Sequence, residues 1–102
     1  MKTNIIPNQN QIEKVFSDRK IHFAALFGSR AKGTAQATSD YDFLVEFAPG
    51  NKYSLLDIVA LKNNLENVLG QEVDLITVGG INPKMANEIK SSQKVIYDRR
   101  KR

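Results

Sequence analysis

Three aspartates in this sequence are the side chains best placed to do chemistry together. Asp40 and Asp42 are separated by one residue, and Asp74 lies in the next apolar segment. On a strand, residues two apart point to the same face, with Cα atoms about 6.5 to 7 Å apart. Their carboxylates can therefore converge on one divalent cation, and oxygen ligands favour Mg²⁺ or Mn²⁺.

Each aspartate also has an ordinary structural interpretation when it is considered alone. Aspartate is common at loop ends and is usually exposed, and Asp40 follows Ser39 at such an end. Three like charges beside apolar strands are costly unless a cation lies between them. The cluster of three, rather than any one member, predicts a metal site.

Gly28 and Ser29 form a candidate phosphate-binding turn. They follow a nearly continuous apolar run, IHFAALF, at the point where a strand would end. Backbone N–H groups become free there, glycine allows a phosphate to approach, and serine adds a hydroxyl donor. A Gly-Ser pair alone is more often an ordinary turn. A carboxylate pair on the neighbouring strand makes binding of a metal-chelated nucleoside triphosphate the sharper hypothesis.

The elements that would position these residues alternate along the chain. The apolar periodicities predict helices over about 7–19, 54–69 and 83–92, a short helical turn after Gly28, and strands over 21–27, 41–47, 72–78 and 94–97. The pair joined by residues 29–39 is expected to be adjacent, and the helix over 54–69 is long enough for a parallel crossover. We therefore predict an α/β fold, an α+β sandwich with a small mixed sheet of about four strands flanked by helices.

Length and composition limit the classes of protein. The 102 residues make one domain, 1–102, and the absence of cysteine excludes a disulfide framework and a thiol nucleophile. Residues 1–97 carry 11 Lys and Arg against 10 Asp and Glu, so most of the net charge of +4 lies in a basic C-terminal tail, about 98–102. We expect that tail to be solvated, and we expect no membrane span and no direct nucleic-acid binding. A cytoplasmic protein is the default expectation.

The string GSRAKGTAQATSDYDFLVEF, residues 28–47, resembles the signature of the DNA polymerase β-like nucleotidyltransferases. With Gly-Ser, a ten-residue spacer, Asp-x-Asp and a chain of about this length, the sequence is most similar to the minimal nucleotidyltransferases. These are the MNT antitoxins that are paired with HEPN-domain toxins. Asp74, in EVDLIT, stands where the third carboxylate of the family is expected.

The resemblance implies a role for each matching residue. Asp40 and Asp42 would chelate two Mg²⁺ ions, and Asp74 would complete the second site and orient or deprotonate the acceptor hydroxyl. Gly28 and Ser29 would hold the β and γ phosphates of ATP. Arg30 could reach a phosphate oxygen with its planar guanidinium, and Lys32 is a second candidate cation.

Two functions from different classes follow, with a weaker third. The first is Mg²⁺-dependent transfer of AMP from ATP to a hydroxyl; the resemblance implies a tyrosine on a cognate HEPN ribonuclease toxin, which the modification would silence. The second is a non-catalytic antitoxin that neutralises the toxin by binding alone. The third is a small nucleic-acid binder that uses the basic tail, for which the salt dependence of binding would be the test.

Overall fold

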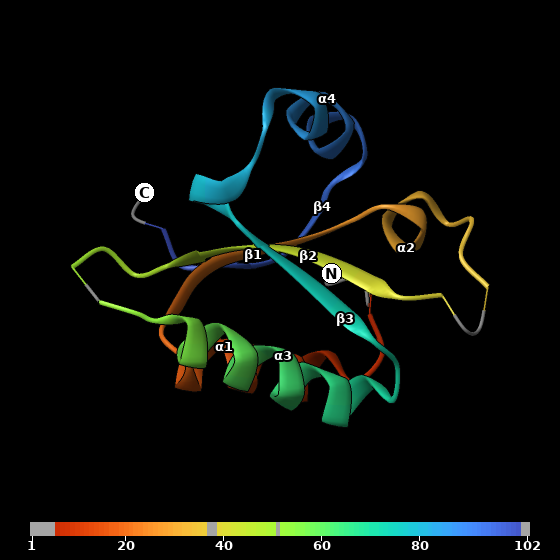
Figure 1. Ribbon diagram of the computed structural model, residues 1–102. Helices are drawn as coiled ribbons and strands as arrows, with labels where there is room; N and C mark the ends of the chain where they lie inside the picture. Colours follow the sequence, from red (N-terminus) through yellow and green to blue (C-terminus); the bar gives the residue numbers. More distant parts are fainter. Residues whose placement is uncertain (1–5, 37–38, 51, 101–102) are drawn as a thin grey trace.

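Helices and strands alternate along the chain in the predicted order (Figure 1). The computed structural model describes residues 6–36, 39–50 and 52–100. The elements are α1 (Gln9–Asp18), β1 (Ile21–Phe27), α2 (Ser29–Lys32), β2 (Tyr41–Phe47), α3 (Leu55–Leu69), β3 (Val73–Thr77), the 3-10 turn η1 (Val78–Gly80), α4 (Pro83–Ser92) and β4 (Lys94–Asp98). The strands β1 and β2 begin and end at the predicted residues, because each is a short apolar run bounded by turn residues.

The four strands form one mixed sheet in the order β3-β2-β1-β4. β1 pairs antiparallel with both β2 and β4, and β2 pairs parallel with β3. A parallel pair needs a long crossover, which the helix α3 supplies. The predicted adjacency of β1 and β2, the parallel crossover and the small mixed sheet are all confirmed.

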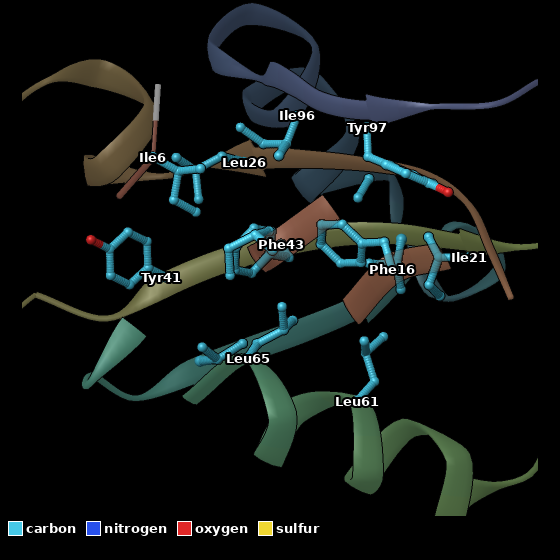
Figure 2. Close-up of a cluster of buried hydrophobic side chains, with 14 of the residues drawn as sticks. Ile6, Phe16, Ile21, Leu26, Tyr41, Phe43, Leu61, Leu65, Ile96 and Tyr97 are labelled. Atoms are coloured by element: carbon cyan, nitrogen blue, oxygen red, sulfur yellow. The ribbon is translucent and has the colours of Figure 1, made fainter. Parts of the chain in front are cut away.

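One face of the sheet is covered by α1 and α3, which lie side by side below it in Figure 1. Figure 2 shows Phe16 of α1 beside Phe43 of β2, with Leu61 and Leu65 entering from α3. The two rings meet edge to face at 5.9 Å between centroids, and all four of these side chains are fully buried. This well-packed layer holds β2, and therefore the aspartates, in place.

The opposite face, which we call the α4 face, is covered less completely. It carries Phe23, Ala25 and Phe27 from β1 and Leu44 from β2, packed against Ile89 of α4. At its margin Val95 of β4 remains 45% exposed. Because side chains alternate along a strand, Asp42 shares this face with Leu44.

The sequence signals at the helix ends have their expected effects. Ser54 and Asp57 form a capping box at the start of α3, in which the Ser54 N–H donates to Asp57 Oδ2 at 2.8 Å, and Gly70 ends the helix in a left-handed conformation. The Asn82 side chain accepts a hydrogen bond from the Met85 N–H before α4. In the described part of the chain, no helix combines the length and the apolar character that a bilayer crossing requires.

Two local expectations need correction. The helix α1 begins at Gln9 rather than near Pro7, because Asn8 at its N-cap takes a left-handed conformation. Residues Val78–Gly80 leave the sheet as a 3-10 turn instead of extending β3. The described part of the basic tail is exposed, as expected, and its backbone continues from the sheet: β4 ends at Asp98, and the Arg99 N–H donates to the His22 carbonyl at 2.8 Å. Residues 101 and 102 lie outside the described residues.

Candidate active site

Asp42 and Asp74 are brought together by the register of the sheet. They are paired positions on the parallel strands β2 and β3, so both side chains lie on the α4 face. Asp42 is half-buried and Asp74 is exposed, and Asp40 lies exposed one residue before β2 begins. This placement agrees with the prediction that the three carboxylates lie near one another. We call this region, at the start of the parallel strands β2 and β3, the corner of the sheet.

The electrostatics of the corner centre on Asp42. The pKa of the Asp42 carboxyl is raised to about 6, chiefly by burial and in addition by the negative charges of Asp74 and Asp40, a hydrogen bond with Asp74 and the charge of Glu88. Each of these causes disfavours the ionised form. A cation beside Asp42 would stabilise the ionised carboxylate, so the electrostatics of the corner favour binding of a cation.

The carboxylate oxygens at the corner suit a cation that already carries phosphate and water ligands. In residues 6–36, 39–50 and 52–100, no three carboxylate or imidazole side chains converge as a ready-made metal cage. Mg²⁺ is usually held by one or two carboxylates together with substrate phosphates and water, rather than by an all-protein cage. The pair Asp42 and Asp74, with Asp40 nearby, therefore fits Mg²⁺ carried by a triphosphate.

Gly28 closes the corner from the side of β1. Its φ of 75° and ψ of −154° lie in a region that is essentially restricted to glycine. A Cβ added here would lie 2.5 Å from Asp42 Oδ2, so a side chain would collide with the carboxylate. Because Phe27 pairs with Asp42 in the sheet, the predicted phosphate turn Gly28-Ser29 lies directly against the predicted metal ligand.

Arg30 lies on the other side of β2. Its Nη2 donates to the Ser39 carbonyl at 2.8 Å, and its guanidinium carbon lies 4.1 Å from the centroid of the Tyr41 ring. Tyr41 alternates with Asp42 and is buried in the core against α1 and α3. In this position Arg30 holds the loop before β2; its predicted contact with a phosphate oxygen stays a prediction.

Glu88 of α4 is the functional candidate that the sequence analysis missed. It pairs with Lys32 at 3.6 Å, with both side chains about half exposed, and its charge contributes to the raised pKa of Asp42. The pair links α2 to α4 beside the aspartates and places Lys32 on the same side as Asp42. No motif marks Glu88, because only the packing of α4 on the sheet brings it to the site.

The fold and this corner together define a class of protein. A small mixed sheet with a Gly-Ser turn against an Asp-x-Asp strand, and a third carboxylate on the parallel neighbour, is the framework of a nucleotidyltransferase. The family model described as Polymerase beta, Nucleotidyltransferase matches residues 10–102. The chain belongs to this family, so the predicted fold and class of enzyme are confirmed.

Comparison with known proteins shows which nucleotidyltransferases the chain is similar to. A candidate protein adenylyltransferase of Methanocaldococcus jannaschii is 42% identical over 86 residues, which are 84% of this chain and 90% of that protein. Protein adenylyltransferase MntA of Thermococcus cleftensis is 31% identical over 90 residues, 88% of this chain and 84% of that protein. A crystal structure of a toxin-antitoxin with AMP-PNP matches with a TM-score of 0.75 at 25% identity, over 89% of this chain and 73% of that chain. The resemblance to the minimal nucleotidyltransferases of toxin-antitoxin pairs is thereby confirmed.

Proposed function

We propose that this chain is an antitoxin that transfers AMP from ATP to a tyrosine hydroxyl of a cognate HEPN-domain toxin, in the cytoplasm. The observation that carries the proposal is the contact between Gly28 and Asp42, with Asp74 paired to Asp42 on the next strand. The Gly28-Ser29 turn, proposed to bind phosphate, therefore lies beside two carboxylates that repel each other. The relatives named as adenylyltransferases support the choice of AMP as the transferred group.

The three carboxylates have distinct tasks in this proposal. Asp40 and Asp42 would hold Mg²⁺, and Asp74 would complete a second Mg²⁺ site. When bound, Mg²⁺ would neutralise negative charge on the phosphates and on the departing pyrophosphate. Asp74 is exposed, so it can also accept a hydrogen bond from an incoming hydroxyl and take its proton.

The phosphate side of the site is assigned to the turn after β1. Gly28 has no side chain that would exclude a phosphate oxygen from Asp42, and the Ser29 hydroxyl can donate to such an oxygen. Lys32 lies on this side, although it is paired with Glu88. A triphosphate would compete with the Glu88 carboxylate for the Lys32 ammonium.

The reaction balances with one bond formed and one broken. The tyrosine oxygen forms a bond to the α phosphorus of ATP, and the bond from that phosphorus to the bridging oxygen breaks. Pyrophosphate leaves with the electron pair of that bond, and the hydroxyl proton passes to Asp74. The modified tyrosine keeps AMP as a phosphodiester, which adds bulk and charge to the toxin.

The test is transfer of label to the partner. The chain is incubated with Mg²⁺, α-³²P-labelled ATP and the cognate HEPN toxin, and the products are separated on a denaturing gel. Asp42→Asn removes the central carboxylate at constant size, and Asp18→Asn makes the same change at an exposed position on α1. We expect label on the toxin with the wild-type chain and Asp18→Asn, and its loss with Asp42→Asn.

Neutralisation without transfer would support the other class of function. If Asp42→Asn still binds the toxin and still suppresses its ribonuclease activity, inhibition is by occlusion. If the wild-type chain binds ATP and the toxin but transfers no label, the proposed reaction is wrong. If the wild-type chain labels the toxin, replacement of the proposed tyrosine by phenylalanine tests the acceptor: loss of label supports the tyrosine, and retained label assigns the modification to another residue.

A further inference from the structure

An ion pair beside the aspartates joins α2 to α4. The Lys32 ammonium of α2 lies 3.6 Å from the Glu88 carboxylate of α4, and the two side chains are 47% and 57% exposed. Exposed ion pairs contribute little to the stability of a fold. An arriving ligand can reach both groups, so the pair matters chiefly for the charges that it presents to the neighbouring nucleotide site.

The Lys32 backbone is anchored next to the proposed phosphate turn. Its N–H donates to the Gly28 carbonyl at 3.1 Å, and the preceding residue, Ala31, is buried in the core. Gly28 in turn lies directly against Asp42, because a Cβ on Gly28 would be 2.5 Å from Asp42 Oδ2. The Lys32 side chain therefore starts from backbone that is held close to the residues proposed to bind the triphosphate.

Glu88 is positioned by the packing of α4 on the sheet. The next residue, Ile89, is only 3% exposed and belongs to the apolar cluster of the α4 face. The negative charge of Glu88 is felt at the active site, because it is one of the causes of the raised pKa of Asp42. In the free chain Glu88 thus has two effects: it adds negative charge near the corner, and it neutralises the ammonium of Lys32.

These charges act differently on the two forms of a nucleoside triphosphate. A metal-free triphosphate brings its full negative charge to Asp42 and Asp74, and it must take the Lys32 ammonium away from Glu88. With Mg²⁺ bound, the phosphate and carboxylate oxygens share a positive charge, so the nucleotide can bind while the ion pair stays intact. Glu88 therefore opposes binding of the metal-free form more than binding of the loaded form.

We propose that Glu88 makes the nucleotide site selective for Mg²⁺-loaded ATP by withholding Lys32 from a metal-free triphosphate. The inference rests on the proposed function, because it concerns the same nucleotide site. It gives Glu88 a part in specificity, since Glu88 takes no proton in the proposed reaction and holds no ligand of its own. Because that reaction requires Mg²⁺, the selectivity would keep the site from filling with a nucleotide that cannot react.

The experiment measures the Kd of ATP by titration calorimetry, first in EDTA without Mg²⁺ and then with saturating Mg²⁺. The selectivity is the ratio of the metal-free Kd to the Mg²⁺-loaded Kd. Glu88→Gln removes the charge at constant size, and Lys32→Met removes the ammonium. The matched controls, Asp18→Asn and Lys14→Met, alter an exposed ion pair of 3.4 Å on α1, which covers the opposite face of the sheet (Figure 1). The melting temperature of each ligand-free variant verifies folding.

We expect Glu88→Gln to strengthen binding of metal-free ATP about fivefold and to change Mg²⁺-loaded binding by less than about twofold, so the selectivity falls. In a Lys32→Met chain the same substitution should gain about twofold or less, because no ammonium is left to release. Both controls should keep the wild-type ratio. The gain in Glu88→Gln should shrink between about 0.1 M and about 1 M salt, as the Debye length falls from about 10 Å to about 3 Å.

Several results would overturn the inference. These are a wild-type ratio near one, an unchanged ratio in Glu88→Gln, and an equal gain for both forms of ATP. A full gain from Glu88→Gln in the Lys32→Met chain would also overturn it, because Glu88 would then act without Lys32. A ratio that changes as much in the α1 controls would show a general effect of surface charge.

The outcomes separate this inference from the proposed function. If the wild-type chain binds neither form of ATP, the proposed function fails and the inference fails with it. If the wild-type chain binds Mg²⁺-loaded ATP and labels the toxin while Glu88→Gln keeps the wild-type ratio, the function stands and the role of Glu88 is wrong.

Discussion

Replacement of Gly28 by alanine is the sharpest test of how the active site is built. The new Cβ would lie 2.5 Å from Asp42 Oδ2, much closer than van der Waals contact allows for non-bonded carbon and oxygen atoms, so one of the two groups must move. The backbone conformation itself costs a non-glycine residue on the order of 1 to 3 kcal/mol, and overpacking costs about 1 to 3 kcal/mol more. We therefore expect the free energy of unfolding to fall by about 2 to 6 kcal/mol.

Gly33→Ala is the control for the conformational part of this cost. Gly33 also has a positive φ, 79°, but no atom lies within 4 Å of a Cβ placed there. We expect it to destabilise the fold by only about 1 to 2 kcal/mol, the cost of the left-handed conformation. Urea denaturation followed by circular dichroism measures both changes, and 1 kcal/mol corresponds to a melting shift of about 4 to 8 °C for a domain of this size.

A double-mutant cycle isolates the contact with Asp42. Asp42→Ala removes the carboxylate and leaves the Asp42 Cβ, 3.7 Å from the new methyl group. In that background the cost of Gly28→Ala should fall by about 1 to 3 kcal/mol. If the cost of Gly28→Ala is the same with and without the Asp42 carboxylate, the argument that this side chain requires glycine at position 28 is refuted.

Three further results should follow. Because the pKa of Asp42 is raised to about 6 in the fold, this group favours folding most below about pH 4, and that contribution is lost as the pH rises through 6. At pH 8 the free energy of unfolding of Asp42→Asn should therefore exceed that of the wild-type chain by about 1 kcal/mol after allowance for solvent screening. The difference should vanish near pH 4, and an equal difference at both pH values would contradict the raised pKa of Asp42. Mg²⁺ with ATP at about 100 times its Kd should stabilise the wild-type chain by about 2.7 kcal/mol, and calorimetry should find no such gain for Asp42→Asn if the site is correctly placed. Phe43→Ala should cost about 3 to 5 kcal/mol in urea denaturation because Phe43 is fully buried, whereas Tyr53→Ala, at a 44% exposed position, should cost less than half as much.

The fold was predictable from the sequence wherever local signals agreed with burial. The strands β1 and β2 are apolar runs between turn residues, and the helix ends at Ser54 and Gly70 carry cap residues whose effect is local. The start of α1 was predicted two residues too early, because Pro7 suits a first turn but the backbone turns at Asn8. The 3-10 turn at Val78–Gly80 has apolar and glycine residues that a strand end could equally contain.

The candidate site was predictable in part. The spacing of Asp40 and Asp42 and the parallel crossover to Asp74 follow from strand geometry, so the sequence placed these carboxylates at one corner. The position of Arg30 depends on stacking with Tyr41, and that of Glu88 depends on how α4 packs. Such contacts are set by tertiary structure, and a residue's type and spacing do not reveal them.

The place of β4 in the sheet has a consequence for the synthesis of the protein. β1 is an inner strand, and one of its two edges pairs with β4, which follows all the other described helices and strands along the chain. While residues 94–98 are still inside the ribosome, that edge of β1 has no partner in the sheet and exposes a run of backbone N–H and C=O groups to other chains. A message that stops before these residues would therefore yield an aggregation-prone nascent chain rather than a partly active enzyme.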